Sequence, residues 1–128
     1  MRKLTGILFL LLAFAASLAA TQTTSHYETK TGFLIPSQCQ PRPGMTKPKG
    51  SYDDWPAPHT TECALREACI KSGYGLWAED KFFRFDEKGQ KIALEYFKTT
   101  KRTSYNKVEV LGEFRDGQVG LEMMRPVD

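Results

Sequence analysis

The chain has 128 residues, of which 41% are hydrophobic and 26% are charged, a length that allows one domain with a single core. Lys and Arg number 18 against 15 Asp and Glu, but Arg2 and Lys3 belong to an N-terminal segment that we expect to be removed. The remaining excess of positive charge is too small to indicate a nucleic-acid-binding protein.

The first twenty residues have the order of a secretory signal peptide. Two basic residues precede an apolar run over 7–16, and small residues follow it, which predicts cleavage after Ala19 or Ala20. The apolar run is shorter than the roughly 20 residues that a membrane-spanning helix needs. We therefore predict a signal peptide over 1–20 and a single domain over 21–128 without a membrane span, in the bacterial periplasm or secreted.

An extended segment over 26–36 is followed by a long proline-rich loop over 36–59. Proline removes a backbone donor and fixes φ, so this composition predicts neither a regular helix nor a strand. The prolines of this loop are Pro36, Pro41, Pro43, Pro48, Pro56 and Pro58.

A short amphipathic helix is predicted next. Thr60 or Thr61 is suited to cap its first turn, and Gly73 is suited to the left-handed backbone that ends a helix after Ser72. At 100° per residue the buried side of this helix comprises Ala64, Leu65, Ala68, Cys69 and Ser72.

In one continuous helix, Cys63 and Cys69 point in diverging directions. Six residues of helical rise separate them by ~9 Å. That distance exceeds the roughly 7 Å between Cα atoms that a disulfide allows. We therefore expect that these two cysteines do not bridge each other.

Strands over 76–78 and 82–85 flank a predicted turn at 79–81, and the segment 86–89 is predicted to end the second strand. A helix is expected over 90–100. Its buried face comprises Ala93, Leu94 and Phe97.

The last part of the chain alternates apolar and polar residues, which predicts two strands. Asp116 and Gly117 supply a tight hairpin turn between them. The apolar faces comprise Val108, Val110, Gly112 and Phe114 before the turn, and Val119, Leu121 and Met123 after it.

The order of these elements predicts a mainly β, α+β fold. Five strands with a helix between strands 3 and 4 are typical of an OB-like barrel. Here an extra helix follows the proline-rich loop between strands 1 and 2. The alternative is an open α+β sheet with two packed helices.

The segments GFLIPSQC, HTTECALREACIKSGYG, KFFRFDEKGQKIA and VEVLGEF resemble a group of small secreted bacterial proteins of uncharacterised function with a predicted OB-like domain. The most specific part of the resemblance is a set of three cysteines and one histidine followed by the letters SGYG. The set comprises Cys39, His59, Cys63 and Cys69. The resemblance implies the fold and the compartment, and it implies no activity.

Three cysteines in an exported protein predict one disulfide and one remaining thiol. Because Cys63 and Cys69 diverge, Cys39 must supply the partner, and we expect the pair Cys39–Cys69. The chain-entropy view gives a loop of that size, roughly 30 residues, about 3–4 kcal/mol of stabilisation. Cys63 is then the third thiol, with His59 four residues before it, which leaves a thiol redox protein using Cys63 as one alternative.

A metal site is the other alternative. Thiolates and an imidazole suit zinc or copper, and the set Cys39, His59, Cys63 and Cys69 has the composition of a Cys3His site. Its spacing, His-x3-Cys-x5-Cys, differs from that of the zinc knuckles.

OB barrels bind ligands across strands 2 and 3, where this chain has a candidate ligand face of Trp77, Lys81, Phe83 and Arg84. The near-neutral charge of residues 21–128 argues against a nucleic acid, so we expect a small molecule or a protein as the partner. The sequence thus predicts an exported, disulfide-stapled OB-like binding or interaction module, without a cofactor and not an enzyme.

Overall fold

The structure, a computed structural model, describes residues 26–41 and 59–128. The predicted signal peptide over 1–20 and most of the predicted loop over 36–59 lie outside these residues and stay predictions. Among the described residues, no helix has the length and apolar character needed to cross a lipid bilayer.

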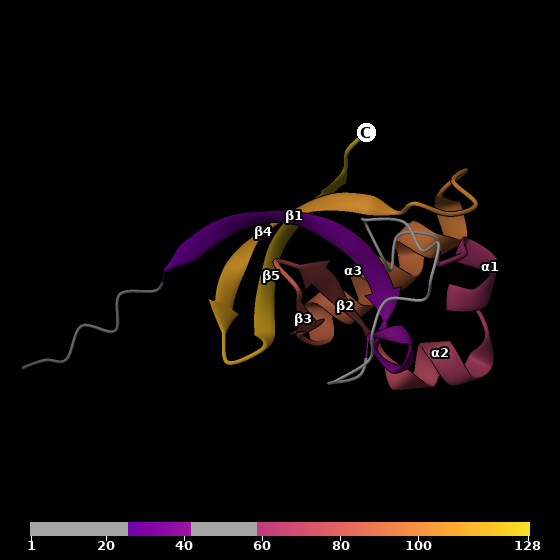
Figure 1. The fold of residues 1–128 in the computed structure, drawn as a ribbon, viewed down its shortest axis with the longest axis horizontal. Helices are drawn as coiled ribbons and strands as arrows, with labels where there is room; N and C mark the ends of the chain where they lie inside the picture. The colour runs from indigo at the N-terminus through magenta and orange to yellow at the C-terminus, as the bar shows by residue number, and fades with distance from the viewer. Residues whose placement is uncertain (1–25, 42–58) are drawn as a thin grey trace, which may run out of the picture.

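Five strands form a closed barrel in the order β1-β2-β3-β5-β4 (Figure 1). Neighbouring strands are antiparallel, except that β3 and β5 run parallel. The strands are β1 (Tyr27–Pro36), β2 (Tyr74–Ala78), β3 (Lys81–Phe85), β4 (Lys107–Arg115) and β5 (Gln118–Pro126). A helix, α3 (Glu87–Thr99), lies between β3 and β4. The OB-like barrel is confirmed, and the alternative of an open sheet is wrong.

Strand β1 closes the barrel because it pairs with two neighbouring strands, β4 and β2. It pairs with β4 from Tyr27 to Phe33, and with β2 from Phe33 to Pro36. The change of partner occurs beside Gly32, where any side chain would collide with the carbonyl oxygen of Trp77. Glycine therefore permits the close approach of β1 to β2 at this corner.

The barrel encloses one hydrophobic core, which α3 covers on one side with Ala93 and Phe97. The predicted inward residues of the last two strands, Val108, Val110, Val119 and Leu121, are all buried. Met123 was predicted to face inward with them, but it is half exposed, because β4 and β5 shift register between Leu111 and Gly112.

Helix α3 begins earlier than predicted. The segment 86–89 was interpreted as the end of a strand, whereas Asp86 caps the helix by accepting a hydrogen bond of 2.8 Å from the backbone N–H of Gly89. Aspartate satisfies the free donors of a first helical turn, so a strand end and a helix cap carry the same local letters. The hairpin turn at Asp116 and Gly117 is confirmed, since both residues have positive φ.

The predicted single helix over 61–72 is two short helices, α1 (Thr61–Ala64) and α2 (Glu67–Ser72). The chain is extended at Arg66, with ψ of 146°, and this residue breaks the helix. The hydroxyl of Tyr74 donates a buried hydrogen bond of 2.7 Å to the carbonyl of Ala64. That carbonyl would otherwise accept from a residue one turn later in a continuous helix, so the tertiary contact stabilises the break.

This break overturns the expectation that Cys63 and Cys69 diverge on one rigid helix. The two cysteines belong to different helices, and the chain turns between them. α1, α2 and the short 3-10 turn η1 (Ser37–Cys39) gather at the end of the barrel where β1 finishes (Figure 1).

Candidate functional site

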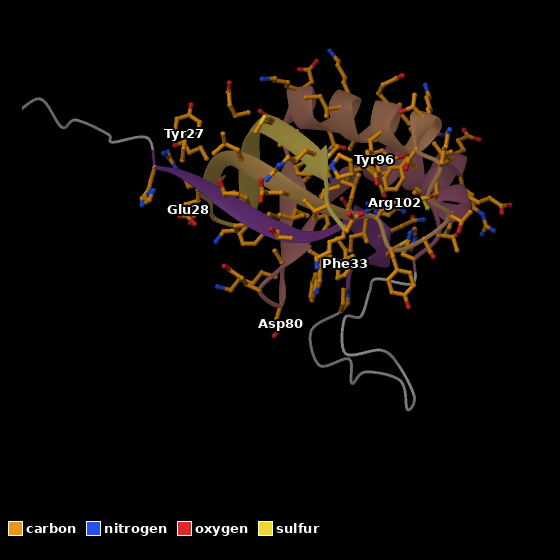
Figure 2. All side chains as sticks on the ribbon, turned by 90° about the horizontal axis from the view of Figure 1, so that it is seen from above. Tyr27, Glu28, Phe33, Asp80, Tyr96 and Arg102 are labelled. Atoms are coloured by element: carbon orange, nitrogen blue, oxygen red, sulfur yellow. The ribbon has the colours of Figure 1, made fainter. Side chains whose placement is uncertain are left out.

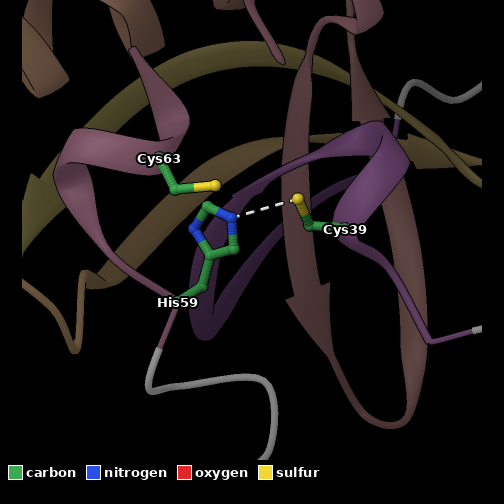
Figure 3. A group of neighbouring side chains, drawn as sticks. All are labelled: Cys39, His59 and Cys63. Atoms are coloured by element: carbon green, nitrogen blue, oxygen red, sulfur yellow. Dashed lines mark hydrogen bonds between the residues drawn. The ribbon is translucent and has the colours of Figure 1, made fainter. Parts of the chain in front are cut away.

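Three side chains that the sequence singled out converge at this end of the barrel (Figure 3). Cys39 comes from η1, and Cys63 from the first turn of α1. His59 lies two residues before that helix. The ring nitrogen Nε2 of His59 lies 3.0 Å from the sulfur of Cys39. One ligand atom from each of the three residues lies within 4.8 Å of the other two.

His59 is held in a neutral form. Burial lowers the pKa of His59 below its ordinary value, because the imidazolium loses its hydration. Its second nitrogen, Nδ1, is buried and has no hydrogen-bond partner among the residues that the structure describes. In either tautomer a neutral imidazole keeps one nitrogen lone pair, and a metal ion uses such a lone pair.

The thiols of Cys39 and Cys63 are protonated at neutral pH. Burial raises the pKa of Cys39 to about 12, and the charges of Cys69 and Cys63 act in the same direction. Burial and the charge of Cys69 also raise the pKa of Cys63, against the opposing effect of Arg66. An activated nucleophile requires a lowered pKa, so this direction gives the redox-enzyme interpretation of Cys63 no support.

Cys69 lies beside the cluster rather than within it. Its side chain is 2% exposed, and its sulfur accepts a hydrogen bond of 3.0 Å from the side-chain amide of Gln38. Because Gln38 precedes Cys39, this hydrogen bond places Cys69 beside the turn that carries Cys39. All three cysteines are free thiols in this structure, so the disulfide expected between Cys39 and Cys69 is not formed here.

Arg84 fastens the two elements that carry Cys39 and Cys69. Its guanidinium reaches from β3 and donates to the hydroxyl of Ser37 at 2.7 Å and to the carbonyl of Ser72 at 2.6 Å. Ser37 opens η1, and Ser72 closes α2. A backbone hydrogen bond of 2.7 Å from Ser37 to the carbonyl of Gly73 joins the same two elements.

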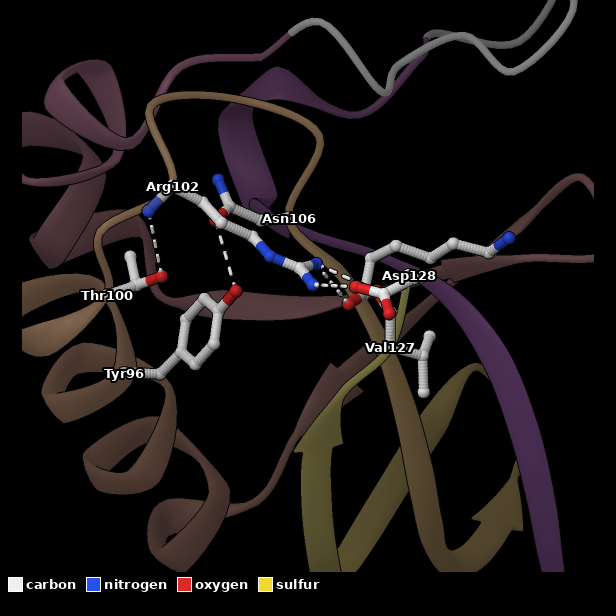
Figure 4. Close-up of polar contacts among 7 residues, drawn as sticks. Tyr96, Thr100, Arg102, Asn106, Val127 and Asp128 are labelled. Atoms are coloured by element: carbon white, nitrogen blue, oxygen red, sulfur yellow. Dashed lines mark hydrogen bonds and ion pairs between the residues drawn. The ribbon is translucent and has the colours of Figure 1, made fainter.

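The helix that carries Cys63 is fastened elsewhere. The hydroxyl of Thr61 donates to the carbonyl of Arg102 at 2.6 Å and accepts from the amide of Asn106 at 3.0 Å. Asn106 is buried and in turn accepts from the hydroxyl of Tyr96 (Figure 4). Thr60 caps α1 by accepting from the backbone N–H of Cys63, which confirms one of the two predicted caps.

The structure separates the predicted ligand face of Trp77, Lys81, Phe83 and Arg84. Phe83 is 8% exposed and belongs to the hydrophobic core. Arg84 serves the cysteine end of the barrel, as described above. Lys81 is exposed, and Trp77 lies on the outer face of β2 opposite Phe33 of β1.

Trp77 borders an open concavity of about 790 Å³ on the outer face of β1 and β2. The lining includes the aromatic residues Phe33 and Tyr105, the basic residues Arg102 and Lys107, and the acidic Asp80. Phe33, Asp80 and Arg102 are labelled in Figure 2. The guanidinium of Arg102 is bound to the carbonyl of Val127 at 2.8 Å and to the Asp128 carboxylate at 3.3 Å (Figure 4).

Sequence reasoning missed the positioning role of five residues, although it named Thr61 as a cap and Arg84 as part of a ligand face. The five are Gln38, Thr61, Tyr74, Arg84 and Asn106. Arg84 alternates with phenylalanines along a strand, and this pattern indicates only that it faces outward. The letters SGYG belong to the most specific part of the resemblance described above. They contain Tyr74, whose hydroxyl stabilises the break between α1 and α2. Gly73 in the same motif has φ of 78°, a backbone conformation that favours glycine.

Comparison of this chain with known protein families, with curated proteins and with solved structures finds no match. The chemistry of the site therefore has to be inferred from its own residues.

Replacing Arg84 with Gln is expected to make Cys39 react about tenfold faster with an alkylating reagent. The substitution removes hydrogen bonds from a charged donor, which contribute about 1.5–3 kcal/mol, and it frees η1 from α2. Modification rates of each cysteine are measured by peptide mass spectrometry on the reduced protein. Arg115→Gln, at an exposed arginine of β4, is the control and should leave the rate unchanged. An unchanged rate in the Arg84 variant would contradict the clamp.

Proposed function

We propose that this protein is an exported metal-binding protein whose ligands are Cys39, His59 and Cys63. The observation that carries the proposal is the convergence of two thiols and a neutral imidazole from three separate elements, with a nitrogen–sulfur distance of 3.0 Å. Export is proposed from the N-terminal sequence pattern alone.

The distances within the cluster suit a thiophilic metal ion. Zinc bonds of ~2.3 Å to sulfur and ~2.0–2.1 Å to nitrogen, at tetrahedral angles, place ligand atoms roughly 3.5–4 Å apart. The three ligand atoms lie within 4.8 Å of one another, with His59 and Cys39 at 3.0 Å, so small side-chain movements are sufficient to reach that geometry. Two thiolates and one imidazole also suit Cu(I).

This site has fewer ligands than the Cys3His set predicted from the sequence. Cys69 contacts the cluster but is not a member of the group of three, and its sulfur already accepts from Gln38. We therefore propose three protein ligands. Zinc would then keep a fourth position for water, as three-ligand zinc sites do.

The reduced protein is expected to bind one zinc or Cu(I) ion per chain, and His59→Gln to weaken that binding by more than about 100-fold. Loss of residues that merely support a ligand already costs about 10–100-fold, so loss of a ligand should exceed it. The affinity is measured by competition with a chromophoric chelator, and the stoichiometry by elemental analysis.

The matched control is His26→Gln, at the other histidine of the chain, which is exposed. It should bind the metal as tightly as the unmodified protein. Substoichiometric metal with both ions, or equal affinities in the two histidine variants, would refute the proposal.

Metal affinity is expected to rise with pH. The pKa values of Cys39 and Cys63 lie above the ordinary value of 9.0, so at neutral pH each ligand thiol must release a proton when the metal binds. The lowered pKa of His59 means that its ring is already neutral and adds no proton release.

Two released protons correspond to a rise in apparent affinity of about 100-fold per pH unit between pH 6.5 and 8. Chelator competition at several pH values gives the slope. In Cys39→Ser, one thiol fewer is deprotonated, and the slope should fall to about tenfold per pH unit. An affinity that is flat or decreases over this range would contradict two thiolate ligands.

A second candidate function is small-molecule binding at the concavity beside Trp77. Its volume of about 790 Å³ lies within the ~300–1,000 Å³ of ligand pockets, and its lining combines aromatic rings with charged groups. This candidate retains Trp77 from the predicted ligand face and replaces the other three residues of that face.

Trp77→Ala is expected to abolish saturation-transfer NMR signals from those members of a fragment library that bind the unmodified protein, because the variant loses the indole wall of the concavity. Lys81→Ala is the control, since Lys81 is exposed on the neighbouring strand and does not line the concavity. If both variants retain the same bound fragments, the concavity is not the binding site.

A further inference from the structure

Cys39 is the thiol that the whole cluster shares. It lies in reach of His59 and Cys63, and its neighbour Gln38 donates a hydrogen bond of 3.0 Å to the sulfur of Cys69. Three sulfurs from three different elements, η1, α1 and α2, therefore gather at this end of the barrel.

The attachments of these elements distinguish the two neighbours of Cys39. η1 and α2, which carry Cys39 and Cys69, are fastened to each other by Arg84 and by the hydrogen bond from Ser37 to Gly73. α1, which carries Cys63, is instead fastened to the segment before β4. The neighbouring positions of Cys39 and Cys69 are thus fixed by the scaffold, without any metal.

The two sulfurs lie on neighbouring elements that are fastened to each other. A disulfide holds its sulfur atoms about 2.05 Å apart, so the side chains of Cys39 and Cys69 have to move toward each other for the bond to form. This movement breaks the hydrogen bond that the Gln38 amide donates to the Cys69 sulfur.

A sulfur within a disulfide has no thiolate to offer a metal ion. If Cys39 bonds to Cys69, only His59 and Cys63 remain from the three ligands, and two ligands are too few for a stable zinc site. The metal-loaded cluster and the disulfide are therefore mutually exclusive states of the same four residues.

We propose that metal binding by this protein is controlled by oxidation, with Cys39 as the shared thiol that either ligates the metal or bonds to Cys69. The inference rests on the proposed metal-binding function. It also accommodates the disulfide expected from the sequence, as the oxidised state of the site rather than as a permanent staple.

With a peroxide as the oxidant, the chemistry balances in two steps. The thiolate of one cysteine attacks a peroxide oxygen, breaks the O–O bond and becomes a sulfenic acid, while the leaving oxygen takes up protons and departs as water. The second thiolate attacks that sulfur, the S–S bond forms, and the hydroxyl leaves as a second water. In sum, two thiolates, one hydrogen peroxide and two protons yield one disulfide and two waters. The metal ion leaves with its charge unchanged.

The experiment uses the full-length protein after reduction and loading with zinc alone. Hydrogen peroxide is added, released zinc is followed with a chromophoric chelator, and disulfides are mapped by peptide mass spectrometry. We expect one zinc released for each Cys39–Cys69 disulfide formed, and recovery of zinc binding after reduction with a phosphine.

Cys69→Ser is the decisive variant. It keeps the three proposed ligands, so it should bind zinc, but it cannot form the disulfide, and its zinc release under peroxide should be at least tenfold slower. Gln38→Ala retains all three thiols and should still release zinc with formation of the same disulfide, which controls for disturbance around Cys69.

The outcomes separate the two proposals. If the reduced protein binds no zinc, the metal-binding function itself fails. If zinc binds but is retained after the Cys39–Cys69 disulfide forms, or is released through a Cys39–Cys63 bond or over-oxidation of one thiol, the metal site stands and control through Cys69 is wrong. Equal release rates from Cys69→Ser and the unmodified protein overturn it as well.

Discussion

The arrangement of the cysteine end of this protein depends on the interruption of a helix at Arg66. An unbroken helix over 61–72 would hold Cys63 and Cys69 about 9 Å apart on diverging sides. The hydroxyl of Tyr74 occupies the carbonyl of Ala64, and the extended backbone of Arg66 redirects the chain into α2. The break puts Cys63 and Cys69 on separate elements, so that both can lie near Cys39.

The barrel supports the three short elements that carry the cluster. η1, α1 and α2 are each one or two turns long, too short to be stable helices in isolation. Arg84 from β3 reaches them with two exposed hydrogen bonds, and Asn106 before β4 with a buried one. The ligand geometry therefore depends on side chains from the opposite part of the chain, and substitutions in the barrel strands should affect the site.

Metal binding and disulfide formation are usually treated as competing interpretations of a cysteine-rich sequence. In this protein the geometry allows both to be proposed as states of one cluster, because Cys39 lies 3.0 Å from the histidine and its neighbour Gln38 is hydrogen-bonded to the buried third cysteine. The raised pKa of Cys39 keeps the free thiol protonated and slow to react at neutral pH. A site of this kind is suited to a stable resting form that changes state only when a metal ion or an oxidant is supplied.

The architecture of the barrel could be predicted from the sequence because its signals are local. Alternation places Val108, Val110, Val119 and Leu121 inward, and Asp116 with Gly117 forms a tight turn, whatever the rest of the chain does. The start of α3 was missed, since Asp86 serves equally well at the end of a strand and at a helix cap. The members of the candidate site were also named from residue type alone, as three cysteines and a histidine close in sequence.

Their spatial arrangement was not predictable in that way. By itself the sequence determined the order of the strands and helices, most of the core residues of the last two strands and the set of reactive side chains, all of which follow from periodicity, turn chemistry and composition. Only the tertiary structure decided that the helix over 61–72 breaks, that Met123 turns out of the core, and that Cys39 lies 3.0 Å from His59. The break and the placement of the cluster depend on hydrogen bonds from Tyr74, Arg84 and Asn106 to groups between 10 and 47 residues away, and no local pattern encodes such contacts.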